Sequence, residues 1–92
     1  MAWVSLRAYR AVGRSLAAAR KRAGVSQDQL AGLLQKPQSF ISAYERGQRR
    51  IDVLELVRIA AALKLDPREL FATILKASQV ERAANNPAMA SG

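Results

Sequence analysis

Apolar residues recur at helical spacing along most of the chain, and no segment alternates between apolar and polar long enough to predict a strand. The first predicted helix runs from Val12 to Ala23, with Leu16 and Ala19 on the same stripe as its two ends. Gly24 follows and suits the left-handed residue that ends many helices.

Two short helices are predicted next, each with its own boundary signals. Ser26, three residues before Gln29, predicts a capping box at the start of a helix. Pro37 interrupts that helix, because the residue before a proline avoids the helical region. A third helix then runs from Gln38 to Arg46 and stops at Gly47. The apolar residues of the second helix are Leu30, Leu33 and Leu34.

A fourth and a fifth helix complete an all-α chain of five short helices. Asp52 is a good N-cap for the fourth, and Asp66, Pro67 and Glu69 repeat the start signal for the fifth. We expect the fifth to continue to about Val80, with any remaining helix ending at Asn85–Pro87. The predicted apolar positions are Val53, Leu56, Val57, Ala60 and Leu63 on the fourth helix, and Leu70, Phe71, Ile74 and Leu75 on the fifth.

The length of 92 residues allows one hydrophobic core. We expect a domain at 12–77, an N-terminal basic extension at 1–11 and a C-terminal tail at 78–92, disordered from residue 88 onward. The extension holds arginines among apolar residues and favours a longer first helix. Its apolar residues are Trp3, Val4, Leu6 and Tyr9, and its arginines, with the one that follows, are Arg7, Arg10 and Arg14.

The sequence contains neither cysteine nor histidine. Disulfides, thiol nucleophiles, most zinc sites and imidazole catalysis are thereby excluded. A glycine-rich phosphate loop is absent too, so we expect no enzyme, no metal and no cofactor. The N-terminus does not resemble a signal peptide and no apolar run is long enough to span a bilayer, which makes a cytoplasmic location the expectation.

The net charge of +8 is unevenly distributed. Residues 1–50 hold ten basic and two acidic side chains, whereas residues 51–92 hold five of each. All of the net charge therefore belongs to the first half, as expected of a protein with one side facing a polyanion. A basic surface that serves only solubility is the alternative.

The segment from Ser26 to Gly47 has the pattern of a helix-turn-helix. Large apolar residues stand one turn apart on each helix, and a small residue, Ala31, stands where the helices would cross. A larger side chain at that crossing would push the two helices apart. The large residues are Leu30 and Leu34 on the first helix, and Ile41 and Tyr44 on the second.

From Val12 to Leu75 the chain resembles the phage-repressor and Cro-type (xenobiotic-response-element) helix-turn-helix family. The resemblance implies a five-helix repressor-like domain that binds double-stranded DNA with helix 38–46 in the major groove. It further implies a sequence-specific transcriptional regulator, which we expect to be a repressor. Such a protein is expected in the cytoplasm, associated with the nucleoid. The matching motifs are Ser26-Gln27-x-x-Leu30-Ala31, Ile41-Ser42-x-x-Glu45-Arg46-Gly47 and Leu63-Lys64-Leu65-Asp66-Pro67.

The resemblance also implies which residues meet the bases. Glutamine at position 38 could form two hydrogen bonds with adenine. Phe40 could pack on a thymine methyl group or a sugar edge, or instead pack against the second helix, and both readings stay open. The residues expected to contact bases are Gln38, Ser39, Phe40, Ser42 and Ala43.

Other matching positions are expected to hold the backbone of DNA or the angle of the third helix. Phosphate contacts fix the register without reading sequence. An ion pair between Arg20 and Glu45 is expected to link the first helix to the third. The residues expected at phosphates are Gln27, which resembles the glutamine that clamps the DNA backbone in this family, and Lys36, Gln48, Arg49 and Arg50.

Three residues of the turn depart from the family pattern. Gln35 stands where a glycine is usual, Lys36 replaces an apolar residue and Pro37 replaces a hydroxyl cap. A non-glycine residue at a left-handed position is strained. These departures affect the shape of the turn and hence the aim of Gln38.

A single recognition helix covers few base pairs, so we expect a homodimer on a symmetric site. The expected interface comprises Leu54, Leu70, Phe71, Ile74 and Leu75. One alternative is an antitoxin-type or accessory protein whose fifth helix and tail, Ala77 to Gly92, bind a protein partner. Another is an interaction module that has kept the fold. The residues before the first helix could also form an arm along the DNA backbone or minor groove.

Overall fold

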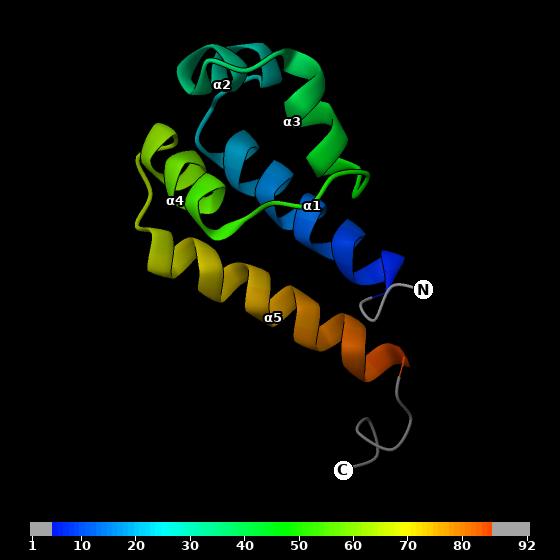
Figure 1. Cartoon of the computed structure of the whole chain (residues 1–92). Coiled ribbons are helices and arrows are strands. Elements are labelled where there is room, and N and C mark those ends of the chain that lie inside the picture. The colour runs from blue at the N-terminus through cyan, green and yellow to red at the C-terminus, as the bar shows by residue number, and fades with distance from the viewer. Residues whose placement is uncertain (1–4, 86–92) are drawn as a thin grey trace.

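The computed structural model describes residues 5–85, and all regular structure in this range is helical. The structure thus has the all-α, five-helix architecture that the sequence predicts (Figure 1). Trp3, Val4 and the tail from residue 88 onward lie outside the described residues. The helices are α1 (Leu6–Arg22), α2 (Gln27–Leu34), α3 (Gln38–Glu45), α4 (Val53–Ala62) and α5 (Pro67–Asn85).

Local capping fixes where α2 and α4 begin. The Ser26 hydroxyl accepts a hydrogen bond from the Gln29 amide at 3.0 Å, and the Gln29 side chain accepts one from the Ser26 amide at 2.8 Å. The predicted capping box is therefore confirmed. Asp52 and Glu55 form a second reciprocal pair at the start of α4, with distances of 2.7 and 3.0 Å. These pairs satisfy amides that a helix start leaves unbonded.

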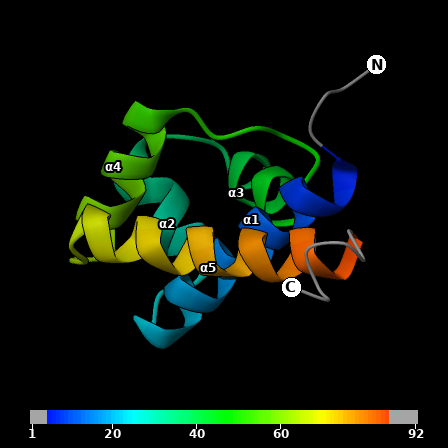
Figure 2. The same cartoon turned by 90° about the horizontal axis from the view of Figure 1, so that it is seen from below.

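Helix α1 begins before Val12, and α5 runs beyond Val80. The first begins at Leu6, where the Ser5 hydroxyl accepts a hydrogen bond from the Ala8 amide. Residues 6–11 thus continue the helix, as the interleaved apolar residues favour, and no break separates them from the domain. The fifth runs to Asn85 and lies along α1, as two perpendicular views show (Figures 1 and 2).

The core lies where α1, α2, α3 and α4 meet above α5. Its largest side chains with less than 2% exposure are Leu16, Leu30, Ile41, Tyr44 and Ile59. Burying a side chain of this size stabilises the fold by about 1.5–3 kcal/mol. Because α2, α3 and α4 are each too short to persist alone, this shared core holds them in place. Within the described residues, no helix is long and apolar enough to cross a membrane.

Two sets of apolar residues lie elsewhere than predicted. Leu70 and Ile74 are only 3% and 7% exposed and belong to the core of the protomer, so assigning them to a dimer interface was wrong. Conversely, Val53 and Val57 of the predicted α4 core stripe are exposed, Val53 by 76%. The reason is packing: α5 buries one face against α1, and α4 turns Ile59 inward instead.

A glycine in the middle of α1 sets how closely α3 approaches. A Cβ atom added at Gly13 would lie 2.7 Å from the carbonyl carbon of Glu45 and closer still to the carbonyl oxygens of Tyr44 and Glu45. Only a residue without a side chain allows this contact between the two helices. Gly13 therefore helps set the position of the C-terminal end of α3.

Candidate nucleic-acid interface

The two helices of the helix-turn-helix pack on a shared core and are joined by a tight turn. Ala31 of α2 is buried in that core. Gln35 adopts the left-handed conformation, with φ 57° and ψ 44°, and the Lys36 amide donates to the Ala31 carbonyl at 3.0 Å. The turn thus keeps the shape that glycine favours, with a glutamine at the left-handed position.

The first turn of α3 presents its polar residues to solvent. Pro37 is the N-cap and makes no side-chain capping hydrogen bond. Gln38 and Ser39 are exposed, and Ser42 and Ala43, one turn later, are half-buried. These four residues follow one another at helical spacing, so they share one side of α3.

A chain of hydrogen bonds ties the start of α3 to the interior. The Arg20 guanidinium donates to both carboxylate oxygens of Glu45, at 2.7 and 3.1 Å. The Gln27 amide nitrogen donates to the same carboxylate at 2.8 Å, and the Gln38 amide nitrogen donates to the Gln27 oxygen. The expected partners Arg20 and Glu45 thus form a salt bridge, and hydrogen bonds continue from Glu45 through Gln27 to Gln38.

The salt bridge at the inner end of this chain is well shielded from water. The side chains of Arg20 and Glu45 are 9% and 6% exposed. The hydrogen bonds that Arg20 donates to Glu45 raise the pKa of Arg20, and Arg20 also donates to the Val25 carbonyl at 2.9 Å. This pair links α1 directly to the C-terminal end of α3. The link through Gln27 could not be read from the sequence, because it joins residues of three helices.

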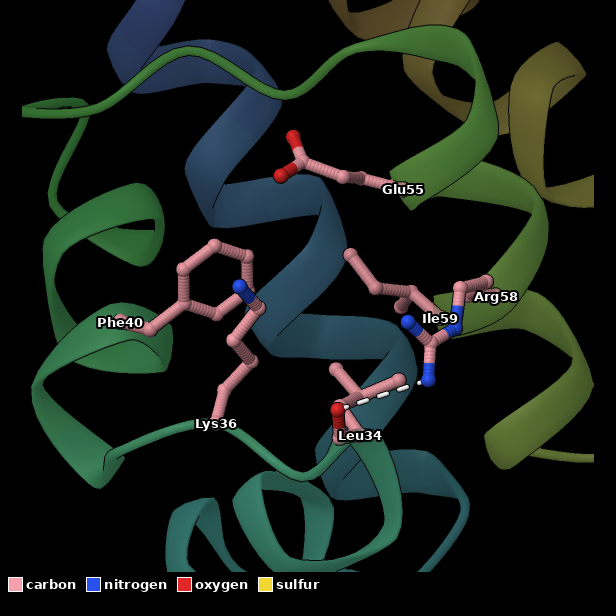
Figure 3. A pocket seen from close by; sticks show the side chains of 6 residues that line it. All are labelled: Leu34, Lys36, Phe40, Glu55, Arg58 and Ile59. Carbon is pink, nitrogen blue, oxygen red and sulfur yellow. Dashed lines mark hydrogen bonds between the residues drawn. The ribbon is translucent and has the colours of Figure 1, made fainter.

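Phe40 lies between α3 and α4 and packs against the core (Figure 3). Its ring meets Tyr44 edge-to-face at 5.6 Å, with the Lys36 amine 5.5 Å and the Arg49 guanidinium carbon 4.4 Å from its centroid. Such contacts between cations and an aromatic face are attractive. Of the two open readings of Phe40, this geometry favours packing, here combined with a platform for two cations.

The basic residues after α3 differ in what they contact. Arg49 forms two hydrogen bonds with Glu55, at 3.1 and 2.9 Å, and this interaction lowers the pKa of Glu55. The guanidinium carbon of Arg50 lies 5.4 Å from the ring centroid of Tyr9, which stands near the N-terminal end of α1. Gln48 is exposed. To bind a phosphate, Arg49 would therefore have to release the Glu55 carboxylate or bind both anions at once.

Tyr44 is an unusual core residue because its hydroxyl is buried without a partner among the described residues. Burial raises the pKa of this hydroxyl, so it stays neutral. Its contribution to the site is the ring, which supports Phe40. Among the side chains that the structure describes, no group of three or more metal-binding residues occurs.

Comparison with known proteins identifies this arrangement. A helix-turn-helix family model matches residues 16–70. The restriction-modification controller protein C.AhdI from Aeromonas hydrophila is 34% identical, covering 71% of this chain and 94% of its own, with a TM-score of 0.66. An XRE-family like protein from Pseudomonas syringae pv. tomato is 36% identical over 76% of this chain and 85% of its own, with a TM-score of 0.67.

A third structure, the clp gene regulator ClgR from Corynebacterium glutamicum, shares the fold at 22% identity with a TM-score of 0.76, covering 92% of this chain and 88% of its own. No curated protein sequence matches the chain. The family match spans the C-terminal part of α1, all of α2, α3 and α4, and the first turn of α5, and so contains the whole helix-turn-helix described above. The chain therefore belongs to the XRE family of helix-turn-helix proteins and is a DNA-binding transcriptional regulator rather than an enzyme.

Proposed function

We propose that the protein is a sequence-specific repressor that binds DNA as a homodimer and reads the major groove with α3. The observation that carries this proposal is the hydrogen-bonded chain that ends at Gln38. A side chain held by its neighbours before DNA arrives loses less conformational freedom on binding. Gln38 is exposed at the first position of α3, where it could form two hydrogen bonds with adenine.

Base reading is assigned to one side of α3. Ser39, Ser42 and Ala43 accompany Gln38 there, and small side chains let the helix enter the groove deeply. Phe40 is left out of this set and is assigned to holding Lys36 and Arg49 beside the helix, because its ring packs against the core.

Phosphate contacts are assigned to both ends of α3. Lys36 precedes the helix, Gln48, Arg49 and Arg50 follow it, and Gln27 stands at the first position of α2. The side-chain oxygen of Gln27 accepts a hydrogen bond from Gln38. A phosphate bound at Gln27 would therefore lie next to the base that Gln38 contacts. Such contacts give affinity and register, whereas the bases give sequence.

The test is selection from a random DNA duplex pool at near-physiological salt. The double variant Gln38→Ala, Ser39→Ala is compared with wild type and with Thr73→Ala, an exposed residue of α5. We expect wild type and Thr73→Ala to enrich the same palindrome, and the double variant to lose or relax it at one pair of symmetric positions. Enrichment of nothing by wild type, or an unchanged palindrome in the double variant, contradicts the proposal.

The dimer is assigned to the exposed apolar residues that α4 and α5 leave uncovered. Leu54, Phe71 and Leu75 remain from the sequence prediction, and Val53 and Val57 join them because they too are exposed. Apolar side chains gathered on neighbouring helices are typical of a homodimer interface. Sedimentation of wild type and of Leu54→Glu at micromolar concentration tests this; a monomeric wild type at every concentration contradicts it.

Repression follows if a bound dimer excludes other proteins from the same duplex. Transcription in vitro from a promoter that overlaps the selected palindrome should fall as wild type is added, and should not fall with Gln38→Ala, Ser39→Ala. Increased transcription with wild type would show an activator instead.

A further inference from the structure

The first turns of α1 lie directly beside the loop that follows α3. A Cβ atom added at Gly47 would lie 2.8 Å from the Cγ and 2.9 Å from the Cα of Arg10. Gly47 has φ 76°, which favours glycine for a second reason. Figure 1 shows this loop crossing α1, and in Figure 2 it bends beside the N-terminal turns of α1. The contact between Arg50 and the Tyr9 ring joins the same two segments.

Many arginines of the described chain are occupied by internal partners. Three of them pair with carboxylates and a fourth donates to a backbone carbonyl. A guanidinium already paired with a carboxylate contributes less to binding an external anion, because its charge is compensated locally. These residues are Arg20 with Glu45, Arg49 with Glu55, Arg68 with Asp66, and Arg58 with the Leu34 carbonyl.

Arg10, Arg46 and Arg50 are in a different condition. All three are exposed, and none of their guanidinium groups has a carboxylate partner among the side chains that the structure describes, those of residues 5–78. Arg50 contacts the ring of Tyr9, which orients its charge without compensating it. The three side chains thus carry uncompensated positive charge on both sides of Gly47.

Arg46 lies at the C-terminal end of the side of α3 that carries Ser39 and Ser42. Ser39, Ser42 and Arg46 are three and four residues apart, so they line one side of the helix. Arg46 is the C-cap, and the next residue, Gly47, touches Arg10. Lys36, by contrast, lies before the start of α3. Cations therefore flank the helix at both ends.

We propose that Arg10, Arg46 and Arg50 form a phosphate-binding surface, here called the α1–loop surface, that extends the DNA contact onto the N-terminal turns of α1. It rests on the proposed function, because it needs α3 in the major groove. The phosphate backbones run along both edges of that groove. Lys36 and the α1–loop surface would then bind opposite edges, which fixes the tilt of α3 without reading any base. Tyr9 acts as a positioning residue for Arg50.

The decisive variant is Arg10→Gln, which removes the charge but keeps the Cβ and Cγ atoms packed on Gly47. Arg22→Gln is the matched control, since Arg22 is an exposed arginine of the same helix that lies beside Leu65 and Glu69 instead. Arg50→Gln is a second test variant that leaves the contact at Gly47 untouched. Circular dichroism melts check that each variant is folded.

The measurement is the salt dependence of Kd for the selected duplex and for a scrambled duplex. Loss of one phosphate contact should reduce the magnitude of the slope of log binding constant against log salt concentration by about 0.9 for each protomer bound to the duplex. We expect this for Arg10→Gln and Arg50→Gln on both duplexes, with an unchanged ratio between the two affinities. Arg22→Gln should keep the wild-type slope, and Arg10→Lys should restore it.

Each other outcome overturns the proposal. If Arg10→Gln keeps the wild-type slope while wild type binds its palindrome, the DNA contact does not extend onto α1, and the proposed reading of the palindrome by α3 stands. If Arg10→Gln changes the affinity ratio between the duplexes, Arg10 affects base recognition instead. If wild type binds neither duplex, the proposed function itself fails.

Discussion

The two helix-interior glycines of this chain should respond in opposite ways to the same substitution. Gly13 in α1 faces the backbone carbonyl groups of Tyr44 and Glu45, whereas a Cβ at Gly32 in α2 would meet nothing within 4 Å. Alanine favours a helix over glycine by about 1 kcal/mol at either position. Only at Gly13 does a steric cost oppose this gain.

The steric cost at Gly13 follows from the geometry of the contact. Ordinary van der Waals contact begins at 3.4 Å, and the Cβ of alanine would lie 2.7 Å from the Glu45 carbonyl carbon. The two helices would therefore have to separate by at least about 0.7 Å, since backbone atoms cannot rotate away. Overpacking of this kind costs about 1–3 kcal/mol, occasionally more. Because three backbone atoms lie within 2.7 Å of the added Cβ, the steric cost should be in the upper part of this range, about 2–3 kcal/mol. After the helical gain of about 1 kcal/mol, Gly13→Ala should lower the free energy of unfolding by about 1–2 kcal/mol.

Equilibrium urea unfolding, followed by circular dichroism, compares both variants with wild type at one protein concentration. Gly32→Ala should raise the free energy of unfolding by about 0.5–1 kcal/mol and leave DNA affinity unchanged. Gly13→Ala should weaken DNA binding as well, because the separation moves α3 relative to α1. The reasoning is refuted if Gly13→Ala is as stable as wild type or more stable.

Three further substitutions test the interior of the site. Tyr44→Phe removes a buried hydroxyl without a partner among the described residues, so urea unfolding should find it equal to wild type or up to about 1 kcal/mol more stable; a loss above 1 kcal/mol would reveal a missed partner. Glu45→Ala leaves the buried charge of Arg20 uncompensated and should cost about 3–5 kcal/mol, whereas a thermal melt equal to wild type would show that the pair is not formed. Because Arg49 lowers the pKa of Glu55 below its ordinary 4.5, this pair stabilises the fold above that pH and the contribution is lost as pH falls. In urea titrations from pH 7 to pH 3, Glu55→Gln should therefore lose less stability than wild type, and an equal loss counts against the pair.

The helix boundaries and the family motifs could be predicted because they depend on neighbours in sequence. A capping box needs only residues three apart, as at Ser26 and Gln29, and a left-handed stop needs only the glycine that follows. The uneven charge, too, is visible in the sequence, and it indicates a polyanionic partner.

The division of the apolar residues on α4 and α5 was decided by tertiary packing. Leu70 and Leu75 look alike in the sequence, yet one is buried and the other is 44% exposed. The amphipathic pattern shows that a segment has the period of a helix. It does not show which part of a wide apolar face the neighbouring helices will cover. For the same reason Val53 was placed in the core by its pattern and lies on the surface.

The site shows the same limit. The sequence by itself determined a helix-turn-helix, a polar first turn on α3 and a surplus of positive charge in the first half of the chain. Only the tertiary structure decided that Gln27 links Gln38 to Glu45, that Phe40 turns toward the core, and that Arg10 lies against Gly47. Each of these contacts joins residues of different helices, and the relative placement of helices depends on the packing of the whole core rather than on any local pattern.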